Sequence, residues 1–288
     1  MAANDVTPVH IQTYESTVRY LSQQMRMKME PWCMFRAQDS GGHNWERLAQ
    51  GAYNSKTPGT KTATPEDGDV FSRRQSVPLV IDKGELVTQE DIVQTLIDPK
   101  SSLAQNQVYA MYRGMDDEVF DAVDRDASDG AGGTVALPAE QKLGDGSTSI
   151  SYDLITAVGE IFDGNDVDQD APKCFVISPA QKRKLLQLTE ATSADYNALR
   201  PLEEGKIAYW MGYAWIVSTR LNSEGAGQVT CLAMTADAVG FNINQGITAH
   251  VAQDPGYSFD WRIYTNSVFG AVRVHDERVV TLDLSETI

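Results

Sequence analysis

The sequence has 288 residues, enough for one large domain or two lobes, and 42% of them are hydrophobic, so a sizeable core can form. The net charge of −16 argues against a protein that grips nucleic acid through clustered lysines and arginines. Three widely spaced cysteines, Cys33, Cys174 and Cys231, have neither disulfide nor metal spacing. The sequence shows no signal peptide and no apolar run near the ~20 residues that cross a bilayer. We therefore expect folding in a reducing cytoplasm, without membrane association.

The first predicted element is a helix over Thr13–Met29. Its apolar stripe includes Tyr14 and Met25 and recurs at three- and four-residue spacing. A stripe this narrow cannot form a core alone, so the helix must dock on another surface. That surface belongs either to its own domain or to a neighbouring subunit, and the sequence leaves both open.

Residues 36–76 are polar, rich in turn signals such as Thr57-Pro58-Gly59, and poor in aliphatic side chains. A loop this long is unusual inside a compact enzyme domain. The segment is either a flexible, solvated loop or a long two-stranded β-ribbon that contacts other copies of the protein through its charges. The side chains that such a ribbon would present are Arg36, Arg47, Arg73 and Arg74, with Glu66, Asp67 and Asp69 as partners.

Residues 98–128 predict one long amphipathic helix, the beam that would carry this loop. Asp98 is placed to cap it and Pro99 fits its first turn. At 1.5 Å per residue the helix is roughly 40 Å long. The glycine-rich run Asp129–Gly133 is expected to stop it. Two shorter elements are predicted before it: a strand over 76–82 and a helix over 88–97.

Residues 151–250 alternate strand and helix patterns, which indicates a separate α+β lobe. After it, Val272 and Val274 lead into the polar turn His275–Arg278, and Val280, Leu282 and Leu284 return. This alternation predicts a C-terminal hairpin with one buried face. Within the lobe the predicted elements are helices over 150–162 and 178–188 and strands over 174–177, 206–218 and 229–234.

A search for catalytic chemistry finds little. Asp166, Asp168 and Asp170 begin like a calcium loop, but the required glycine and the twelfth-position carboxylate are missing, so a solvated acidic turn is the better interpretation. The four histidines are far apart in sequence and lack metal spacing. The pairs Asp116-Asp117 and Asp276-Glu277 are expected to be solvated. We therefore predict no enzyme, no metal and no cofactor.

The order of the elements, and short sequences along nearly the whole chain, resemble the major capsid proteins of tailed bacteriophages, whose fold is shared with herpesvirus capsids and encapsulins. Each short sequence is weak alone, but their order is fairly specific. They are Arg73-Arg74, Val80-Ile81-Asp82, Asp91-Ile92, Ile97–Ser101, Met115-Asp116-Asp117, Ile177–Gln181, Glu204–Ile207, Met211–Tyr213, Ile216–Leu221, Phe269–Arg273 and Glu277–Leu282.

The resemblance implies an α+β fold with four parts: an N-terminal arm over 1–35, an extended loop over 36–85, a peripheral domain over 86–150 and 255–288 with a spine helix over 99–128, and an axial domain over 151–254. It implies an icosahedral shell of hexamers and pentamers around packaged double-stranded DNA. Implied partners are further copies of the chain, a scaffolding protein, a portal protein and a decoration protein. An encapsulin-like compartment and an unrelated cytosolic α+β enzyme are the alternatives.

Overall fold

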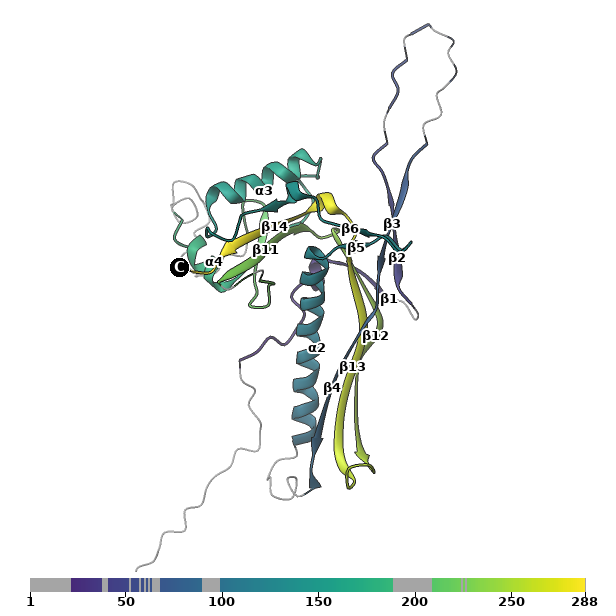
Figure 1. Cartoon of the computed structure of the whole chain (residues 1–288), viewed down its shortest axis with the longest axis vertical. Helices are drawn as coiled ribbons and strands as arrows, with labels where there is room; N and C mark the ends of the chain where they lie inside the picture. The colour runs from purple at the N-terminus through teal and green to yellow at the C-terminus, as the bar shows by residue number, and fades with distance from the viewer. Residues whose placement is uncertain are drawn as a thin grey trace, which may run out of the picture.

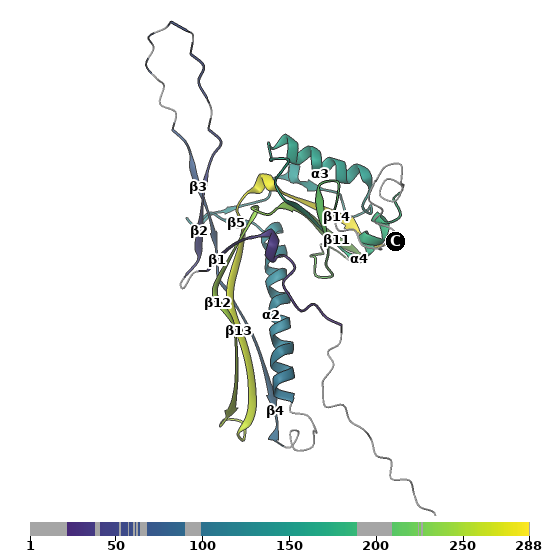
Figure 2. The same cartoon turned by 180° about the vertical axis from the view of Figure 1, so that it is seen from behind.

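The computed structural model describes residues 22–37, 41–51, 53–56, 58–59, 61, 63, 68–89, 99–188, 209–223, 225 and 227–287. The molecule is elongated, with a long helix beside long strands, a lobe at one side, and a ribbon that projects beyond the body (Figures 1 and 2). Among the described helices, none is long and apolar enough to cross a membrane.

Three sheets organise the chain. A four-stranded sheet has the order β1-β12-β13-β4, a six-stranded sheet has the order β7-β14-β11-β8-β10-β9, and a small sheet has the order β2-β3-β5-β6. The first contains β1 (Met34–Ala37), β12 (Val239–Asp254), β13 (Asp260–Arg273) and β4 (Leu79–Val87). The second contains β7 (Lys142–Leu143), β14 (Val279–Ser285), β11 (Gln228–Thr235), β8 (Lys173–Ile177), β10 (Tyr213–Val217) and β9 (Tyr209–Trp210). The third contains β2 (His43–Leu48), β3 (Phe71–Ser76), β5 (Ala127–Ser128) and β6 (Thr134–Val135).

The long helix α2 (Pro99–Asp124) lies along the four-stranded sheet. Gly114 lets the helix approach β4, because a Cβ there would lie 3.2 Å from the side chain of Ile81. The buried stripe Met115, Val119 and Val123 belongs to a core that also takes side chains from the six-stranded sheet. The helix is therefore the element on which both larger sheets pack. From the six-stranded sheet this core receives Cys174, Val176, Leu232 and Met234.

A second core fills the lobe, where α3 (Tyr152–Gly164) and α4 (Pro179–Leu185) cover the six-stranded sheet. Both helices begin at a serine: Ser151 accepts a hydrogen bond from the Leu154 N–H, and Ser178 accepts one from the Gln181 N–H. The fully buried Gln181 side chain accepts a bond from the Ile150 N–H and donates one to the Ser285 carbonyl. It fixes the start of α3, α4 and the C-terminal strand together.

Three consecutive carboxylates on α2 have partners inside the protein, whereas Asp116 and Asp117 were predicted to be simply solvated. Asp116 is fully buried and accepts hydrogen bonds of 3.0 Å from the backbone N–H groups of Lys28 and Met29. Asp117 forms an ion pair with Arg220, and the buried Glu118 forms one with Arg125. Successive helical residues point about 100° apart, so each carboxylate meets a different part of the chain. Burial raises the pKa of Asp116, although these hydrogen bonds act in the opposite direction.

The predicted N-terminal helix is wrong over its last turns, since residues 22–29 are not helical. Met27 and Met29 are buried in the central core, and Asp116 holds the backbone between them. An extended path satisfies both demands, whereas a helix would use the same N–H groups internally. The earlier part of that prediction, with Tyr14, lies outside the described residues, as does the predicted helix over 88–97 apart from its first two positions.

Other boundaries also differ from prediction. Helix α2 ends at Asp124, and residues 127–128 form β5, which pairs with β3 and β6. The strand predicted over 76–82 begins at Leu79 and runs to Val87. The turn at Met211-Gly212 is confirmed, with both residues at positive φ between β9 and β10.

The predicted C-terminal hairpin is wrong. Strand β13 pairs with β12 and β4, whereas β14 pairs with β11 and β7 in the other sheet. The short helix η3 (Asp276–Arg278) carries the chain from one sheet to the other. Strand β12 lies in the range 151–254 predicted for the axial domain, but it belongs to the four-stranded sheet beside α2. Strand β14 lies in the range 255–288 predicted for the peripheral domain, but it belongs to the six-stranded sheet of the lobe.

Replacing Asp116 with alanine is expected to lower the free energy of unfolding by about 3 kcal/mol, because two backbone N–H groups lose their acceptor inside the protein. Urea denaturation measures the change, and faster trypsin cleavage after Arg26 or Lys28 would report release of the segment. Asp121→Ala is the matched control, since that carboxylate is exposed on the same helix; it should change stability by less than about 0.5 kcal/mol. Equal stability of the two variants would contradict this role for Asp116.

Candidate functional site

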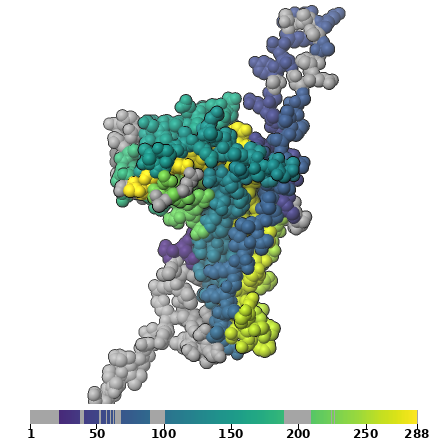
Figure 3. Space-filling model, viewed as in Figure 1, coloured from purple at the N-terminus to yellow at the C-terminus, as the bar shows by residue number. Residues whose placement is uncertain are grey.

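The polar segment, for which the sequence left a solvated loop and a β-ribbon open, begins and ends in two paired strands. Strands β2 and β3 pair antiparallel from His43 opposite Ser76 to Leu48 opposite Phe71, and the Ala49 N–H then bonds the Val70 carbonyl. Beyond this pair the chain projects past the rest of the molecule (Figure 3). The segment is thus a protrusion whose two strands are paired at its base.

Large apolar side chains are exposed along this protrusion. Tyr53 is 92% exposed and Phe71 is 74% exposed, and Leu48 and Val70 are exposed as well. Exposed apolar side chains grouped on a projection mark a surface that another protein covers. The projection is therefore a candidate contact surface.

A buried carboxylate anchors the ribbon to the body. Asp276 accepts hydrogen bonds of 2.7 Å from Arg74 on β3 and 2.7 Å from Arg273 on β13, and Arg47 on β2 lies 3.4 Å away. We call these four residues the Asp276 anchor. Both ribbon strands therefore supply an arginine to one carboxylate, which joins the base of the ribbon to the body.

Arg273 extends the anchor to the end of the spine helix. Its side chain is fully buried, and it donates hydrogen bonds to the carbonyls of Val123, Arg125 and Val135 at 2.7, 2.8 and 2.9 Å. Carbonyl groups at a helix C-terminus lack helical partners and carry partial negative charge, which a guanidinium stabilises. The ribbon, the four-stranded sheet and α2 are therefore joined through one charged group.

The electrostatics favour an ionised Asp276. Burial alone raises the pKa of this carboxyl, but the hydrogen bonds from Arg273 and Arg74 outweigh it and hold the pKa below its ordinary value. The pKa of the neighbouring His275 is lowered by burial and by Arg47, so the imidazole is neutral near pH 7. The anchor thus combines three cations with one buried anion, and Glu277 adds a second carboxylate 3.3 Å from Arg47.

Apolar packing supports the same base. The Trp45 ring on β2 lies over Gly240 of β12 so closely that a Cβ there would be 2.3 Å from the ring. Trp45 also packs with Ala127, Val272 and Val274. Only glycine allows this contact, so the ribbon is held by shape as well as by charge.

The predicted contact residues divide into groups. Arg47 and Arg74 are engaged inside their own chain by the anchor, and Arg73 pairs across the ribbon with Glu46 at 2.8 Å, where both side chains are about half exposed. Arg36, Asp69 and Met25 are exposed. Tyr14, Glu66 and Asp67 lie outside the described residues.

Sequence reasoning missed Asp276 and Arg273, the centre of the anchor. Asp276 was expected to be a solvated turn residue, and a strand position gave no sign that Arg273 would be fully buried. One signal was present: an arginine and a carboxylate three residues apart, next to the turn that separates two apolar strands.

Neither a metal-binding cluster nor a reactive thiol is found in the part of the chain that the structure describes. No three histidine, cysteine, aspartate or glutamate side chains there are grouped to hold a metal ion. Burial raises the pKa of all three thiols, that of Cys231 to about 12. The cysteines are packing residues rather than reactive thiolates.

Comparisons with known proteins identify the family and the fold of this chain. Residues 6–286 match the family of phage capsid proteins. No curated protein matches the sequence. The fold is similar to the capsid structure of cyanophage P-SCSP1u, with 13% identity, a TM-score of 0.74, and coverage of 96% of this chain and 93% of that chain. It is similar to a structure from Mycobacterium phage Che8, with 15% identity, a TM-score of 0.71 and coverage of 98% of both chains.

A third similar structure is the capsid asymmetric unit of cyanophage Pam1, with 12% identity, a TM-score of 0.71 and coverage of 99% of both chains. At such low identity these structures establish the fold, while the sequence match establishes the family over nearly the whole chain. The expected α+β capsid fold is confirmed, and a compartment shell is not favoured. This chain belongs to the phage capsid protein family and is a structural protein of the capsid shell.

Proposed function

We propose that copies of this chain assemble into an icosahedral shell around double-stranded DNA, with the ribbon as an intersubunit arm. The observation that carries the role of the arm is a projection with exposed apolar side chains, held rigidly at its base by the Asp276 anchor. A rigid base fixes the direction of the arm, so less orientational freedom is lost when a neighbour is bound.

Individual contacts of the arm need not be strong. A closed lattice repeats each contact many times, and linked contacts add through effective concentration. We propose Arg36, Arg73 and Asp69 as charged contacts, with Glu66, Asp67, Tyr14 and Met25 as further members of the interface. Exposed charges guide association and register more than they raise affinity.

The proposed division of the chain follows its sheets. The arm is carried by a peripheral domain, made of α2 with the four-stranded sheet, and the lobe of the six-stranded sheet is the axial domain around which hexamers and pentamers close. Because β12 belongs to the four-stranded sheet and β14 to the six-stranded sheet, the chain passes repeatedly between the two proposed domains, which supports a tight connection between them. Residues 1–35 remain the proposed N-terminal arm.

We further propose assembly in the host cytoplasm with a scaffolding protein, insertion of a portal protein at one vertex, and a decoration protein on the finished shell. The net charge of −16 supports a wall that encloses DNA without gripping it.

Replacing residues 51–69 with Asn-Gly, a deletion that still leaves enough chain to turn between Ala49 and Val70, is expected to leave a folded subunit that no longer forms shells. The described positions in this segment are exposed, so the melting temperature should change by less than about 2 °C. Sedimentation velocity and electron microscopy measure assembly. Normal shells from the 51–69 deletion would refute the role of the arm.

Replacing Asp276 with asparagine is expected to lower the free energy of unfolding by about 3 kcal/mol, because Arg74 and Arg273 stay buried without their counter-charge. Urea denaturation measures the change. The control is Glu277→Gln, whose carboxylate is half exposed and pairs only with Arg47 among the described residues; it should cost less than about 1 kcal/mol. Similar losses for both variants would show that Asp276 is not the centre of the anchor.

The anchor is expected to weaken in acid. A carboxyl whose pKa is lowered on folding stabilises the folded state fully above its ordinary value of 3.8, and this stabilisation is lost as the pH falls through the folded value below it. The difference in the free energy of unfolding between a chain that keeps Asp276 and its Asp276→Asn variant should therefore be constant down to about pH 5 and shrink below about pH 4. Both proteins carry His275→Gln, so that this histidine does not titrate. A difference that stays constant to pH 3 would contradict the prediction.

A further inference from the structure

An open groove runs along the outer helix of the lobe. It has a volume of about 620 Å³ and lies between α3 and the turn that joins β9 to β10. Its floor includes Ile155, Met211 and Tyr213, while Gly159 and Gly164 leave the helix surface bare. The exposed carboxylates Glu160 and Asp163 stand at its edge. The groove is thus apolar below and acidic at the rim.

The acidic character continues past the groove. The turn after α3 carries Asp166, Asp168 and Asp170, all exposed, and no cation occurs between Glu160 and Asp170. The only lysine that follows closely, Lys173, is buried and donates to the Asp168 and Gln169 carbonyls instead. Among the residues that the structure describes, none of these five carboxylates forms an ion pair, so negative charge gathers at this end of the lobe.

Helix α4 carries the opposite charge. Lys182, Arg183 and Lys184 are consecutive in a chain whose net charge is −16. Within the part of the chain that the structure describes, none of the three forms an ion pair. Three adjacent cations that have no ion-pair partner among the described residues offer a surface that an anionic surface can cover.

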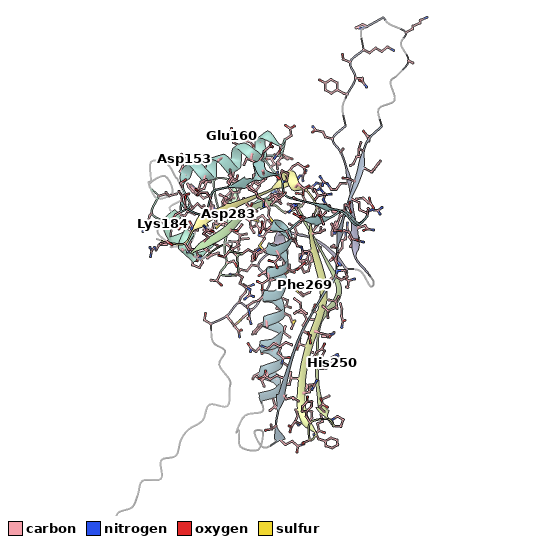
Figure 4. All side chains as sticks on the ribbon, in the orientation of Figure 1. Asp153, Glu160, Lys184, His250, Phe269 and Asp283 are labelled. Atoms are coloured by element: carbon pink, nitrogen blue, oxygen red, sulfur yellow. The ribbon has the colours of Figure 1, made fainter. Side chains whose placement is uncertain are left out.

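The two surfaces lie at opposite ends of the same strands. Tyr213, in the groove, pairs with Lys173 at the start of β8, whereas α4 begins directly after Ile177 at the end of β8. Five residues at 3.3 Å each separate these ends by about 16 Å. Figure 4 labels Lys184 at the outer end of the lobe, apart from Glu160 on α3. None of the three cations lines the groove of its own lobe.

We propose that the groove on α3 receives Lys182, Arg183 and Lys184 of a second copy of this chain, so that the lobes join head to tail. This rests on the proposed assembly of the chain into rings. Lysine and arginine place their methylene stems on apolar surface and keep their charges at a polar edge, which fits a groove with an apolar floor and an acidic rim. A contact between two different surfaces of identical copies closes into a ring when the rotation permits.

Reversing the charges tests the pairing. Lys182→Glu/Arg183→Glu/Lys184→Glu and Glu160→Lys/Asp163→Lys are each expected to fold but to lower the assembled fraction about tenfold at low salt. The two sets combined in one chain restore opposite charges and should recover assembly. Lys182→Arg/Lys184→Arg keeps the charge and should assemble as the unaltered chain does. Normal shells from either reversed variant, or no recovery when they are combined, would overturn the proposal.

A crosslink gives a second, independent readout. With Glu160→Cys and Lys184→Cys in one chain, mild oxidation should give a ladder of disulfide-linked oligomers on a non-reducing gel. Asp153→Cys with Lys184→Cys is the matched control, since Asp153 is exposed on the same helix outside the groove, and it should give no ladder. An unaltered chain that forms no particles would count against shell assembly, whereas absence of the Glu160–Lys184 ladder from assembled particles would count against the groove contact alone.

Discussion

The arrangement of this subunit depends on the hydrogen bonds and the ion pair that the buried Arg273 guanidinium forms. It closes the C-terminal end of the spine helix through two carbonyls, holds β6 through a third, and binds Asp276 at 2.7 Å. A buried charge is costly unless it is paired and its hydrogen-bonding groups are satisfied. Here the paired carboxylate also receives Arg74 of the ribbon, so the same group that completes the helix orients the arm.

A second constraint acts along the spine helix itself. Asp116, Asp117 and Glu118 point in three directions and bind the N-terminal segment, the loop after β10, and Arg125 near the helix end. With the apolar stripe between them, these carboxylates make α2 the common partner of both larger sheets. The chain also passes between the two larger sheets, because β12 and β13 belong to the four-stranded sheet and β11 and β14 to the six-stranded sheet. These connections link the two sheets covalently as well as by packing.

The subunit has a well-packed interior, but parts of its surface carry exposed apolar side chains or charges without partners among the described residues. Its ribbon exposes Tyr53 and Phe71, and its lobe carries an acidic groove at one end and unpaired cations at the other. The proposed shell assembly accounts for both features, because in it each surface is exposed only until a neighbouring copy covers it. The rigid anchor and the polar, repeated contacts together suit a lattice whose copies must find one register among many weak contacts.

The sequence by itself determined the elements whose signals are local. The helical stripe of α2, the serine caps of α3 and α4, and the turn-rich segment between β2 and β3 are written in neighbouring residues, and the order of elements pointed to the capsid fold. Only the tertiary structure decided that β13 and β14 belong to different sheets, that residues 22–29 are extended, and that Asp276 is buried between arginines. The extended path of residues 22–29 and the burial of Asp276 depend on partners 87 to 229 residues away, and β14 pairs with β11 rather than with its neighbour in sequence. Local periodicity does not encode such partners.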